Sequence, residues 1–452
     1  MKKNLLITTY GCQMNVYDSQ RMSDILKPLG YQATTDPADA DMVILNTCHI
    51  REKATEKVFS ELGRLRAHKN KRAKNGKDTI IAVAGCVAQA EGAEITRRAK
   101  YVDMVFGPQT YHELPQMIAE LTRSRDTTDG PGRGILNVEF PSEEKFDFLP
   151  EVTAPNGPSA FLTIQEGCDK FCHFCCVPYT RGAEYSRSSK SIIEEALKLV
   201  DLGAKDITLL GQNVNAYHGK NLTETGEMGL GQLMYELSKI NGLERIRYTT
   251  SHPRDVDEEL IQAHTIEKVM PFLHLPVQSG SDKILKAMNR KHTAQWYLEI
   301  IDRLKAVRPG MAFSSDFIVG YPGENRKDFE DTLSLVNAVK YALCYSFTYS
   351  KRPGTPAATA DFQISEEEKV ERLAILQDLL YKQQTEFNES KIGTIQPVLF
   401  ERLGRKEGQI IGKTPHVQSV HVTGNPRLIG QIIDVDIKGA TQNSLNGTIN
   451  II

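Results

Sequence analysis

Three cysteines in one short loop constrain this chain more than any other feature of its 452 residues. Cys168, Cys172 and Cys175 stand in the order C-x3-C-x2-C after an apolar run that predicts a short buried strand. Thiolates this close on one loop can reach a single inorganic cluster, whereas zinc sites usually take four ligands from two C-x2-C pairs. A four-iron cluster held by three cysteines keeps one iron free for another molecule. Three structural core cysteines are the other interpretation, although this spacing seldom arises from packing alone.

The loop resembles the cysteine motif of the radical S-adenosylmethionine (radical SAM) superfamily, and Phe174 before the third cysteine matches that motif as well. The resemblance implies that the three cysteines hold a 4Fe–4S cluster. Its open iron would bind the amino and carboxylate groups of S-adenosylmethionine (SAM). Cys176 lies outside the spacing and is assigned no role.

Length, charge and cysteine content narrow the class of protein. The chain is long enough for two or three domains, and its net charge of −2 gives no global basic field for a nucleic acid. Eight cysteines are too few for a disulfide scaffold, no signal peptide is recognisable, and no apolar run approaches the roughly 20 residues of a membrane span. We therefore expect a cytoplasmic protein with no membrane association, and any polyanion site must be local.

The first 121 residues predict an N-terminal domain in which strands and helices alternate, as in a doubly wound parallel sheet. Three times an apolar strand-like run ends close to a cysteine: Leu5–Thr9 before Cys12, Met42–Leu45 before Cys48, and Thr79–Ala84 before Cys86. The carboxyl ends of such strands face one crevice, where ligands bind. The pattern therefore predicts a second three-cysteine site, while three unrelated core cysteines remain the other interpretation.

A basic stretch runs from the end of the second helical segment, Glu52–Leu65, to the third strand with almost no compensating acid. Its members are Arg64, Arg66, Lys69, Lys71, Arg72, Lys74 and Lys77. Charge runs are most often a solvated face. In a chain of negative net charge, this run is also the best local candidate for contact with a phosphate backbone.

Residues 122–158 are rich in Pro and Gly and predict a linker, and residues 159–389 predict a second α/β domain. Six strand candidates, most followed by a helical pattern, indicate a partial (β/α)6 barrel, related to the eightfold barrel whose reactive face lies at the strand carboxyl ends. The cysteine loop follows the first strand and falls on that face. The candidates are Phe161–Gln165, Ile207–Gly211, Arg245–Thr250, Phe272–Val277, Phe313–Val319 and Leu343–Tyr349.

Polar groups follow the other barrel strands too, so we expect them to surround the same barrel end. The positions that match the SAM pocket of the superfamily are Phe174, Gln212, Ser251, Gln278, Ser279, Ile318 and Gly320. Glycine lets the backbone approach a ligand closely, and DFIVG (316–320) resembles the stretch beside the adenine of SAM. For each residue taken singly, an ordinary loop role stays open.

Residues 390–452 predict a small β-barrel. Ser365–Glu368 resembles a capping box that opens a long helix. Alternating runs separated by glycines then indicate five antiparallel strands. The segment resembles a TRAM domain, an RNA-binding module, although small barrels also occur as structural caps. The strand candidates are Gln396–Phe400, Gln409–Gly412, Ser419–Val422, Gln431–Ile437 and Gly447–Ile452.

The order of the three parts resembles the radical SAM methylthiotransferase family over essentially the whole chain. The motifs that carry the resemblance are TYGCQMN (9–15), NTCHIREKA (46–54), AGCVAQ (84–89), HLPVQSGSD (274–282) and SSDFIVGYPGE (314–324). Within the family, LLGQNVNAY (209–217) is similar to the bacterial branch that modifies dimethylallyladenosine in tRNA. His49 departs from the smaller residue of many members, but no ligand is lost.

This resemblance implies an enzyme with two 4Fe–4S clusters that uses two SAM molecules per turnover. Cys12, Cys48 and Cys86 would hold an auxiliary cluster that supplies sulfur, which one SAM methylates. The second SAM, at the other cluster, would yield the 5′-deoxyadenosyl radical that removes hydrogen from carbon 2 of the adenosine beside the anticodon. The implied partners are the tRNA anticodon stem-loop and an electron donor such as a flavodoxin, and we expect a monomer.

Two other functions stay open at this stage. The sister branch of the family acts on an aspartate of a ribosomal protein and usually shows Asp-Thr-Thr where this chain has Asn213-Val214-Asn215. The other possibility is a non-catalytic iron–sulfur RNA-binding protein. Such a protein would have no reason to keep the ring of polar groups expected at the carboxyl end of the barrel strands. Only the resemblance separates a dimethylallyl from a threonylcarbamoyl adenosine as substrate.

Overall fold

The computed structural model describes residues 2–48, 54–126, 134–141, 145–150 and 157–449. The chain divides into two compact units, one of residues 1–153 with 176–183 and the other of residues 154–175 with 184–452. His49, part of the expected linker and the last residues of the final strand candidate lie outside the described residues. The domain boundaries drawn from the sequence stay predictions.

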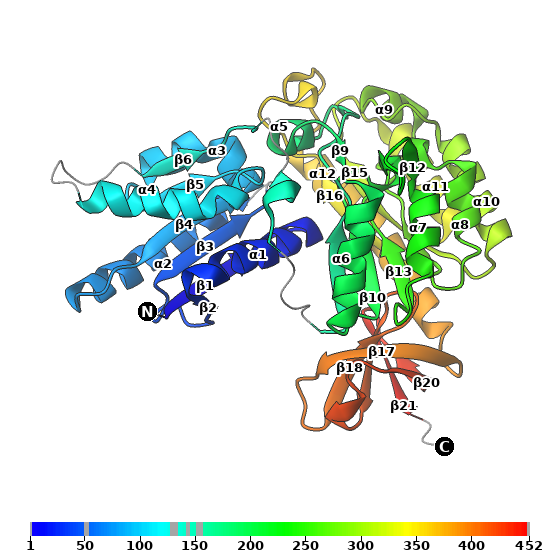
Figure 1. Ribbon diagram of the computed structural model, residues 1–452. Helices are drawn as coiled ribbons and strands as arrows, with labels where there is room; N and C mark the ends of the chain where they lie inside the picture. The colour runs from blue at the N-terminus through cyan, green and yellow to red at the C-terminus, as the bar shows by residue number, and fades with distance from the viewer. Residues whose placement is uncertain (1, 49–53, 127–133, 142–144, 151–156, 450–452) are drawn as a thin grey trace. The chain divides into compact units, whose positions relative to one another are not determined.

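The first unit contains a parallel sheet of six strands in the order β2-β1-β3-β4-β5-β6 (Figure 1). The central strand β3 is buried at all six positions, as expected of a parallel strand covered on both faces. The strands are β1 (Lys3–Thr9), β2 (Tyr31–Ala33), β3 (Met42–Thr47), β4 (Ile80–Gly85), β5 (Met104–Phe106) and β6 (Ile135–Asn137).

Helices cover both faces of this sheet. Met42 and Ile44 of β3 pack with α1 and α4, whereas Val43 and Leu45 pack with α2 and α3, because successive strand residues point to opposite faces. The predicted doubly wound domain is therefore confirmed. The helices are α1 (Gln13–Leu26), α2 (Ala54–Lys74), α3 (Cys86–Arg98), α4 (Leu114–Asp126) and the short α5 (Val177–Arg181).

Two segments of this unit differ from expectation. Helix α2 continues to Lys74, so most of the basic stretch is helical. The expected linker contributes the end of α4 and the sixth strand, β6, which pairs in parallel with β5. β6 is only three residues long, too short for its alternation to stand out in a Pro/Gly-rich sequence.

The second unit holds six further parallel strands in two groups, β13-β10-β7 and β14-β15-β16. A parallel bridge between Ile246 and Val269 links the groups. The strands fall on the six candidates from the sequence, and the predicted partial barrel is confirmed. They are β7 (Ser159–Thr163), β10 (Asp206–Leu210), β13 (Arg245–Tyr248), β14 (Phe272–His274), β15 (Ala312–Val319) and β16 (Leu343–Thr348).

Helices follow these strands and pack around them (Figure 1). The connections between these strands contain two short antiparallel pairs. They are β8 (Gln165–Glu166) with β9 (Tyr185–Ser186), and β11 (His218–Lys220) with β12 (Glu227–Gly229). The helices are α6 (Ser189–Asp201), α7 (Leu230–Ser238), α8 (Glu258–Ala263), α9 (Asp282–Ala287), α10 (Ala294–Val307), α11 (Arg326–Val339) and α12 (Glu366–Glu389).

The start of α12 corrects a detail of the sequence interpretation. Ser365 Oγ accepts a hydrogen bond from the Glu368 backbone N–H at 3.2 Å, so the helix is capped where expected. The Glu368 carboxylate pairs with Arg372 instead of returning to the cap, so the full capping box is not formed there. The box occurs at the start of α11, between Asn325 and Asp328.

The chain ends in a closed five-stranded barrel, β17-β18-β19-β21-β20. The expectation that all its strands are antiparallel is wrong at one pairing, because β19 and β21 run parallel. A closed ring with an odd number of strands cannot alternate direction at every pairing. The strands are β17 (Ile395–Leu403), β18 (Gln409–Lys413), β19 (Ser419–Thr423), β20 (Ile432–Ala440) and β21 (Ser444–Ile449).

Buried arginines join the small barrel to the large one. Arg245, the first residue of β13, donates to the carbonyls of Lys413 and Pro397 at 2.8 and 2.7 Å. Arg247 donates to the carbonyl of Pro415 at 2.7 Å. The small barrel therefore packs at the amino ends of the strands, the end opposite the cysteine loop (Figure 1). No helix in the described ranges combines the length and hydrophobicity needed to cross a lipid bilayer.

Candidate functional site

The first unit brings three distant cysteines together at the carboxyl ends of adjacent strands. Cys12 follows β1 and caps α1, Cys48 follows β3, and Cys86 is the first residue of α3 after β4. The thiols of Cys12 and Cys48 share a hydrogen bond, and Cys12 and Cys86 are close enough to interact electrostatically. The convergence that the alternating pattern predicts is therefore present in the fold.

Two glycines make this convergence possible. Gly11 and Gly85 precede Cys12 and Cys86 and have φ of +107° and +88°, a region that favours glycine. A Cβ on Gly11 would lie 2.0 Å from Cys48 Cβ, and one on Gly85 would lie 2.3 Å from the Thr47 carbonyl oxygen. Any side chain at either position would push neighbouring strand ends apart.

A buried arginine supplies positive charge beside these thiols. Arg181 Nη2 lies 2.8 Å from Asp18 Oδ2 and 3.1 Å from Asn15 Oδ1, and the guanidinium also bonds to the Cys86 thiol. The hydrogen bond from Cys48, together with Arg181, lowers the pKa of Cys12 to about 6, against burial. Burial raises the pKa of Cys86, whereas the charge of Arg181 and its hydrogen bond to the thiol favour the thiolate. Because thiolates are the form that binds metal, these surroundings suit an iron–sulfur cluster.

In the second unit, the loop with the other three cysteines is tied down on both sides. The Gly167 N–H donates to Gln212 Oε1 at 2.5 Å, and the His173 N–H donates to the Met288 carbonyl at 3.1 Å. Asn289 donates to the carbonyls of Lys170 and Phe171 at 3.3 and 3.0 Å. The loop therefore has a defined backbone conformation at the carboxyl end of β7.

The thiols of this loop form a ligand set made of sulfur only. Cys172 is buried, and Cys168 and Cys175 are half-buried. Burial raises the pKa of Cys168 to about 11. Within the described residues, no three or more His, Cys, Asp or Glu side chains are arranged around a single metal ion. A 4Fe–4S cluster binds each thiolate at a different iron, so such a set need not converge on one point.

The residues expected to contact SAM divide into two groups. Ser251 and Gln278 are buried at strand ends, and Ser251 Oγ has no hydrogen-bond partner among the described residues. Ser279 Oγ accepts from the Ser281 N–H and lies 3.3 Å from Thr332 Oγ1, which favours a structural loop role. Gln212 supports the cysteine loop through its bond to Gly167.

Two apolar members of the expected pocket meet in space. Phe174 of the cysteine loop and Ile318 of β15 pack against one buried cluster. The cluster consists of Ile284, Met288, Tyr321, Tyr349 and Ala357. The structure thus places Phe174 of the cysteine motif and Ile318 of the DFIVG stretch against the same apolar surface.

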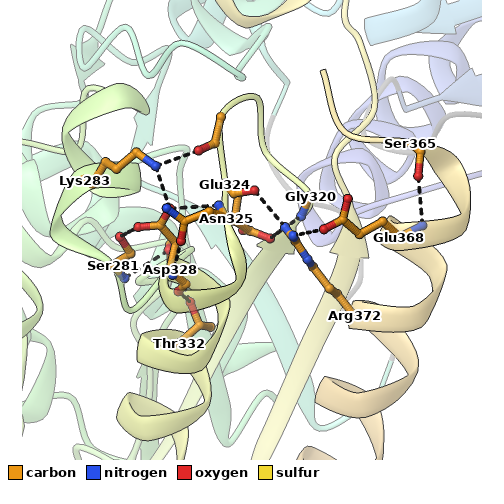
Figure 2. A network of polar contacts seen from close by, with 12 residues as sticks. Ser281, Lys283, Gly320, Glu324, Asn325, Asp328, Thr332, Ser365, Glu368 and Arg372 are labelled. Carbon is orange, nitrogen blue, oxygen red and sulfur yellow. Dashed lines mark hydrogen bonds and ion pairs between the residues drawn. The ribbon is translucent and has the colours of Figure 1, made fainter. Parts of the chain in front are cut away.

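The turn after β15, residues 320–324, is held by a polar network (Figure 2). Glu324 Oε1 accepts from the Gly320 N–H at 2.9 Å and from Arg372 of α12 at 2.6 Å. Asp328 accepts from Ser281 and Lys283 at 2.7 Å each, and Lys283 also reaches the Gly323 carbonyl. Burial raises the pKa of Glu324, against the hydrogen bonds from Gly320 and Arg372. The network fixes the position of Gly320.

Sequence reasoning missed an ionic bridge to the cysteine loop. Lys170 Nζ lies 2.7 Å from Asp255 Oδ1, and the Asn213 amide donates to Asp255 Oδ2 at 2.8 Å. Asn213 is the position at which we expect Asp in the sister branch. A carboxylate there would face Asp255 without a proton to donate, so the amide suits this bridge. Asp255 belongs to no motif, and its role depends on tertiary contacts alone.

Two exposed aromatic side chains were also missed. In the β15–β16 register, Asp316 pairs with Tyr345 and Ile318 pairs with Phe347, so both aromatic residues share the face of Ile318. Tyr345 is 51% and Phe347 is 37% exposed. His274 stacks edge-on against Tyr345, with ring centroids 6.3 Å apart. The alternation of aromatic and small polar residues in Tyr345-Ser346-Phe347-Thr348 is the sequence signal that could have revealed them.

The basic stretch is partly structural. Lys69 pairs with Asp103 and Arg72 pairs with Asp41, and both cations are largely buried. Arg66 stacks over Tyr101, with its guanidinium carbon 5.2 Å from the ring centroid. The remaining exposed lysines are Lys71, Lys74 and Lys77. As a phosphate-binding surface, the stretch is smaller than its sequence indicates.

Comparison with known families divides the chain into three matches. Residues 4–107 match the family described as Uncharacterized protein family UPF0004, residues 162–336 match the Radical SAM superfamily, and residues 389–449 match the TRAM domain. The three-part architecture expected from the sequence is thereby confirmed.

Relatives and a solved structure agree with these matches. The radical S-adenosylmethionine methyltransferase TsrM from Kitasatospora setae shares the fold, with a TM-score of 0.58 at 14% identity over 79% of this chain and 75% of that chain. A tRNA-2-methylthio-N(6)-dimethylallyladenosine synthase of Maricaulis maris (strain MCS10) is 58% identical, covering 99% of this chain and 97% of the relative. The synthase of Rickettsia canadensis (strain McKiel) is 56% identical, covering 99% and 100%. The chain belongs to the tRNA-2-methylthio-N(6)-dimethylallyladenosine synthase family.

Proposed function

We propose that this protein adds a methylthio group to carbon 2 of dimethylallyl-modified adenosine beside the anticodon of tRNA. The observation that carries the proposal is the presence of two thiol triads at strand carboxyl ends, in a chain 58% identical to a named synthase over nearly its full length. A protein that only binds RNA would need neither triad. The neutral amide of Asn213 opposite Asp255 also favours the tRNA branch over the branch that acts on a ribosomal protein.

Two 4Fe–4S clusters and SAM would be held by the two triads and the polar ring. Cys12, Cys48 and Cys86 are the ligands of the auxiliary cluster, and Cys168, Cys172 and Cys175 are those of the SAM-binding cluster. When bound, these groups supply the sulfur, the methyl group and the radical chemistry that an aromatic C–H without an acid–base handle requires. Of the seven expected positions, Phe174, Ser251, Gln278, Ile318 and Gly320 would contact SAM directly. Gln212 and Ser279 would support the surrounding loops, because their side chains already bond to loop groups.

The side chains of the second unit would bind SAM and orient it. The unpartnered hydroxyl of Ser251 is free to bond to a polar group of SAM, and Phe174 and Ile318 form an apolar wall. The bonds of Glu324 to Gly320 and Arg372 hold the turn beside this wall in place. Fixed donors and this apolar wall would position the reactants and help to exclude water, which is the protein's share of such catalysis.

The exposed aromatic pair of β16 would receive the base. Tyr345 and Phe347 lie on the same strand face as Ile318, and aromatic rings offer stacking surfaces to an unstacked base. An adenosine in the anticodon loop has to be turned outward to reach such a surface. Base stacking on this pair therefore brings the substrate next to SAM.

RNA binding is assigned to the small barrel, with support from its surface charge. Arg402, Arg405 and Lys406 are exposed along β17 and the turn after it, where they can neutralise phosphates of the anticodon stem-loop. An electron donor such as a flavodoxin would reduce the SAM-binding cluster. We further propose that the protein acts as a cytoplasmic monomer.

One assay tests the function. The anaerobically reconstituted protein is mixed with SAM, a reductant and tRNA carrying dimethylallyladenosine, and the digested RNA is analysed by mass spectrometry. A methylthio mass shift that requires the dimethylallyl group supports the proposal, and tRNA lacking that group serves as the control. A methylthio group found on a ribosomal protein in place of tRNA would contradict it, as would the absence of 5′-deoxyadenosine.

A further inference from the structure

Arg290 is a buried arginine in direct contact with a cysteine of the loop. It lies in the turn after α9 and is 5% exposed. Its Nη1 donates to Cys172 Sγ at 3.6 Å, and its Nη2 donates to the Pro276 carbonyl. The contact is an N–H···S hydrogen bond, since distances to sulfur are longer than those to oxygen.

The charge of Arg290 has no carboxylate partner within the described part of the chain. Its Nε also finds no hydrogen-bond acceptor among those residues. Arginine keeps its charge in protein interiors, and a buried charge without a counter-charge is costly. A cluster ligated by three thiolates would supply negative charge beside this guanidinium.

Two histidines near Arg290 are kept neutral. His292 stands two positions along the chain, and burial, followed by the charge of Arg290, lowers its pKa to about 4. Burial and Arg290 also lower the pKa of His252, whose ring centroid lies 5.8 Å from that of His292. Lys170 and Arg254 also carry positive charge near His252. Among these cations, Arg290 is the one that donates a hydrogen bond to Cys172.

We propose that Arg290 is a positioning residue that raises the reduction potential of the cluster held by Cys168, Cys172 and Cys175. This inference depends on the proposed function, because it requires that cluster. Reduction adds one electron and so one negative charge to the cluster. Hydrogen bonds to the ligating sulfurs and nearby charge are among the factors that set the potential of such clusters. A cationic donor on Cys172 favours the more negative, reduced state and so eases electron transfer from the donor protein.

The test measures the potential and not the activity. In the full-length chain with Cys12, Cys48 and Cys86 replaced by Ala, only the SAM-binding cluster remains. Its midpoint potential is determined by anaerobic redox titration, followed by electron paramagnetic resonance of the reduced cluster, with iron content measured on each sample. The Arg290 series is R290K, which keeps the charge, R290Q, which keeps a donor, and R290M, which keeps neither.

We expect a shift to more negative potential that is largest for R290M and smaller for R290Q and R290K. R308K is the matched control, because Arg308 of the same unit donates only to backbone carbonyls, such as those of His264 and Ile266. Its potential should equal that of the parent. If R290M loses iron, the midpoint potentials of R290K and R290Q decide whether Arg290 tunes the cluster.

The outcomes separate the inference from the function on which it depends. Full iron content with unchanged potentials across the Arg290 series would overturn the tuning role and leave the proposed function standing. A parent variant that binds no iron at the Cys168 loop would overturn both. An equal shift in R308K would show that the effect is a general loss of packing and would also overturn the tuning role.

Discussion

The two thiol triads reach a similar ligand set by opposite routes. Cys168, Cys172 and Cys175 lie in one loop, so their spacing is visible in the sequence and eight residues bring them together. Cys12, Cys48 and Cys86 come from three strand ends and meet only because β1, β3 and β4 are neighbours in a parallel sheet. The first set depends on a loop, and the second depends on a whole domain.

The supporting contacts differ in the same way. The single loop is held by bonds from outside it, such as those of Asn289 and Asp255, and no strand has to pass close to another. The triad across the sheet needs two glycines where strand ends approach and a buried Arg181–Asp18 pair beneath the thiols. Core substitutions in the first unit should therefore displace the cysteines of its triad. Equivalent core substitutions in the second unit should disturb the cysteine loop less.

The largest effect is expected from removing one ligand of each triad. C172A should abolish both 5′-deoxyadenosine and methylthio product, because the SAM-binding cluster is lost. C48A should abolish the product but leave SAM cleavage, because only the sulfur source is lost. Chromatography of the nucleosides and iron analysis measure both. The control is C344A, which removes a cysteine outside both triads and should retain the parental iron content. Product formation by C48A at the parental rate would contradict the division of roles between the triads.

The next effect is expected at Arg181. R181M leaves the buried Asp18 carboxylate without its principal partner, with Lys145 Nζ still 3.9 Å away. Breaking a buried pair costs about 3–5 kcal/mol, and iron at the auxiliary cluster should fall with it. Urea unfolding measures the loss. R97M is the matched control, since Arg97 pairs with Glu94 at the surface, where an ion pair contributes at most about 1 kcal/mol. Equal losses in the two variants would contradict a role for the buried pair.

A smaller effect is expected from one methyl group. G11A places a Cβ 2.0 Å from Cys48 Cβ in a backbone conformation with φ of +107°, and overpacking of this kind costs about 1–3 kcal/mol. The auxiliary cluster should lose iron while the SAM-binding cluster keeps it. In G63A, the new methyl of helix α2 meets nothing within 4 Å, so it should stabilise by roughly 0.5–1 kcal/mol. Differential scanning calorimetry with iron analysis tests the pair, and parental auxiliary iron in G11A would refute the close approach.

The same contrast explains how much of the fold could be predicted. The strands that end just before a cysteine or a glycine turn, such as β3 and β15, follow the sequence pattern closely. β6 was missed because three residues in a Pro/Gly-rich segment show no periodicity. The parallel pairing of β19 with β21 follows from the closure of a five-membered ring, which no local pattern encodes.

Side chains that act through tertiary contacts were beyond sequence reasoning. The capping box was expected at Ser365 because Glu follows three residues later, but Arg372 competes for that carboxylate. Arg290 and Asp255 stand in no spacing motif, and their importance appears only when the chain places them beside the cysteine loop. Cys168, Cys172 and Cys175 needed no such help, because their chemistry lies within one loop.

The smallest effect concerns the bridge that anchors that loop. N213D would remove the donor to Asp255 and set two carboxylates against each other, at a cost of about 1–3 kcal/mol for a buried group left unsatisfied. The double variant N213D/D255N reverses donor and acceptor and should recover much of this loss. The carboxylate introduced at position 213 can accept from the new amide nitrogen, while the new amide oxygen can still accept from Lys170. Thermal unfolding of the parent, both single variants and the double variant closes a mutant cycle. Additive losses would mean that the bridge does not anchor the loop. Recovery would show that a triad confined to one loop still depends on contacts from the turns that follow β10 and β13.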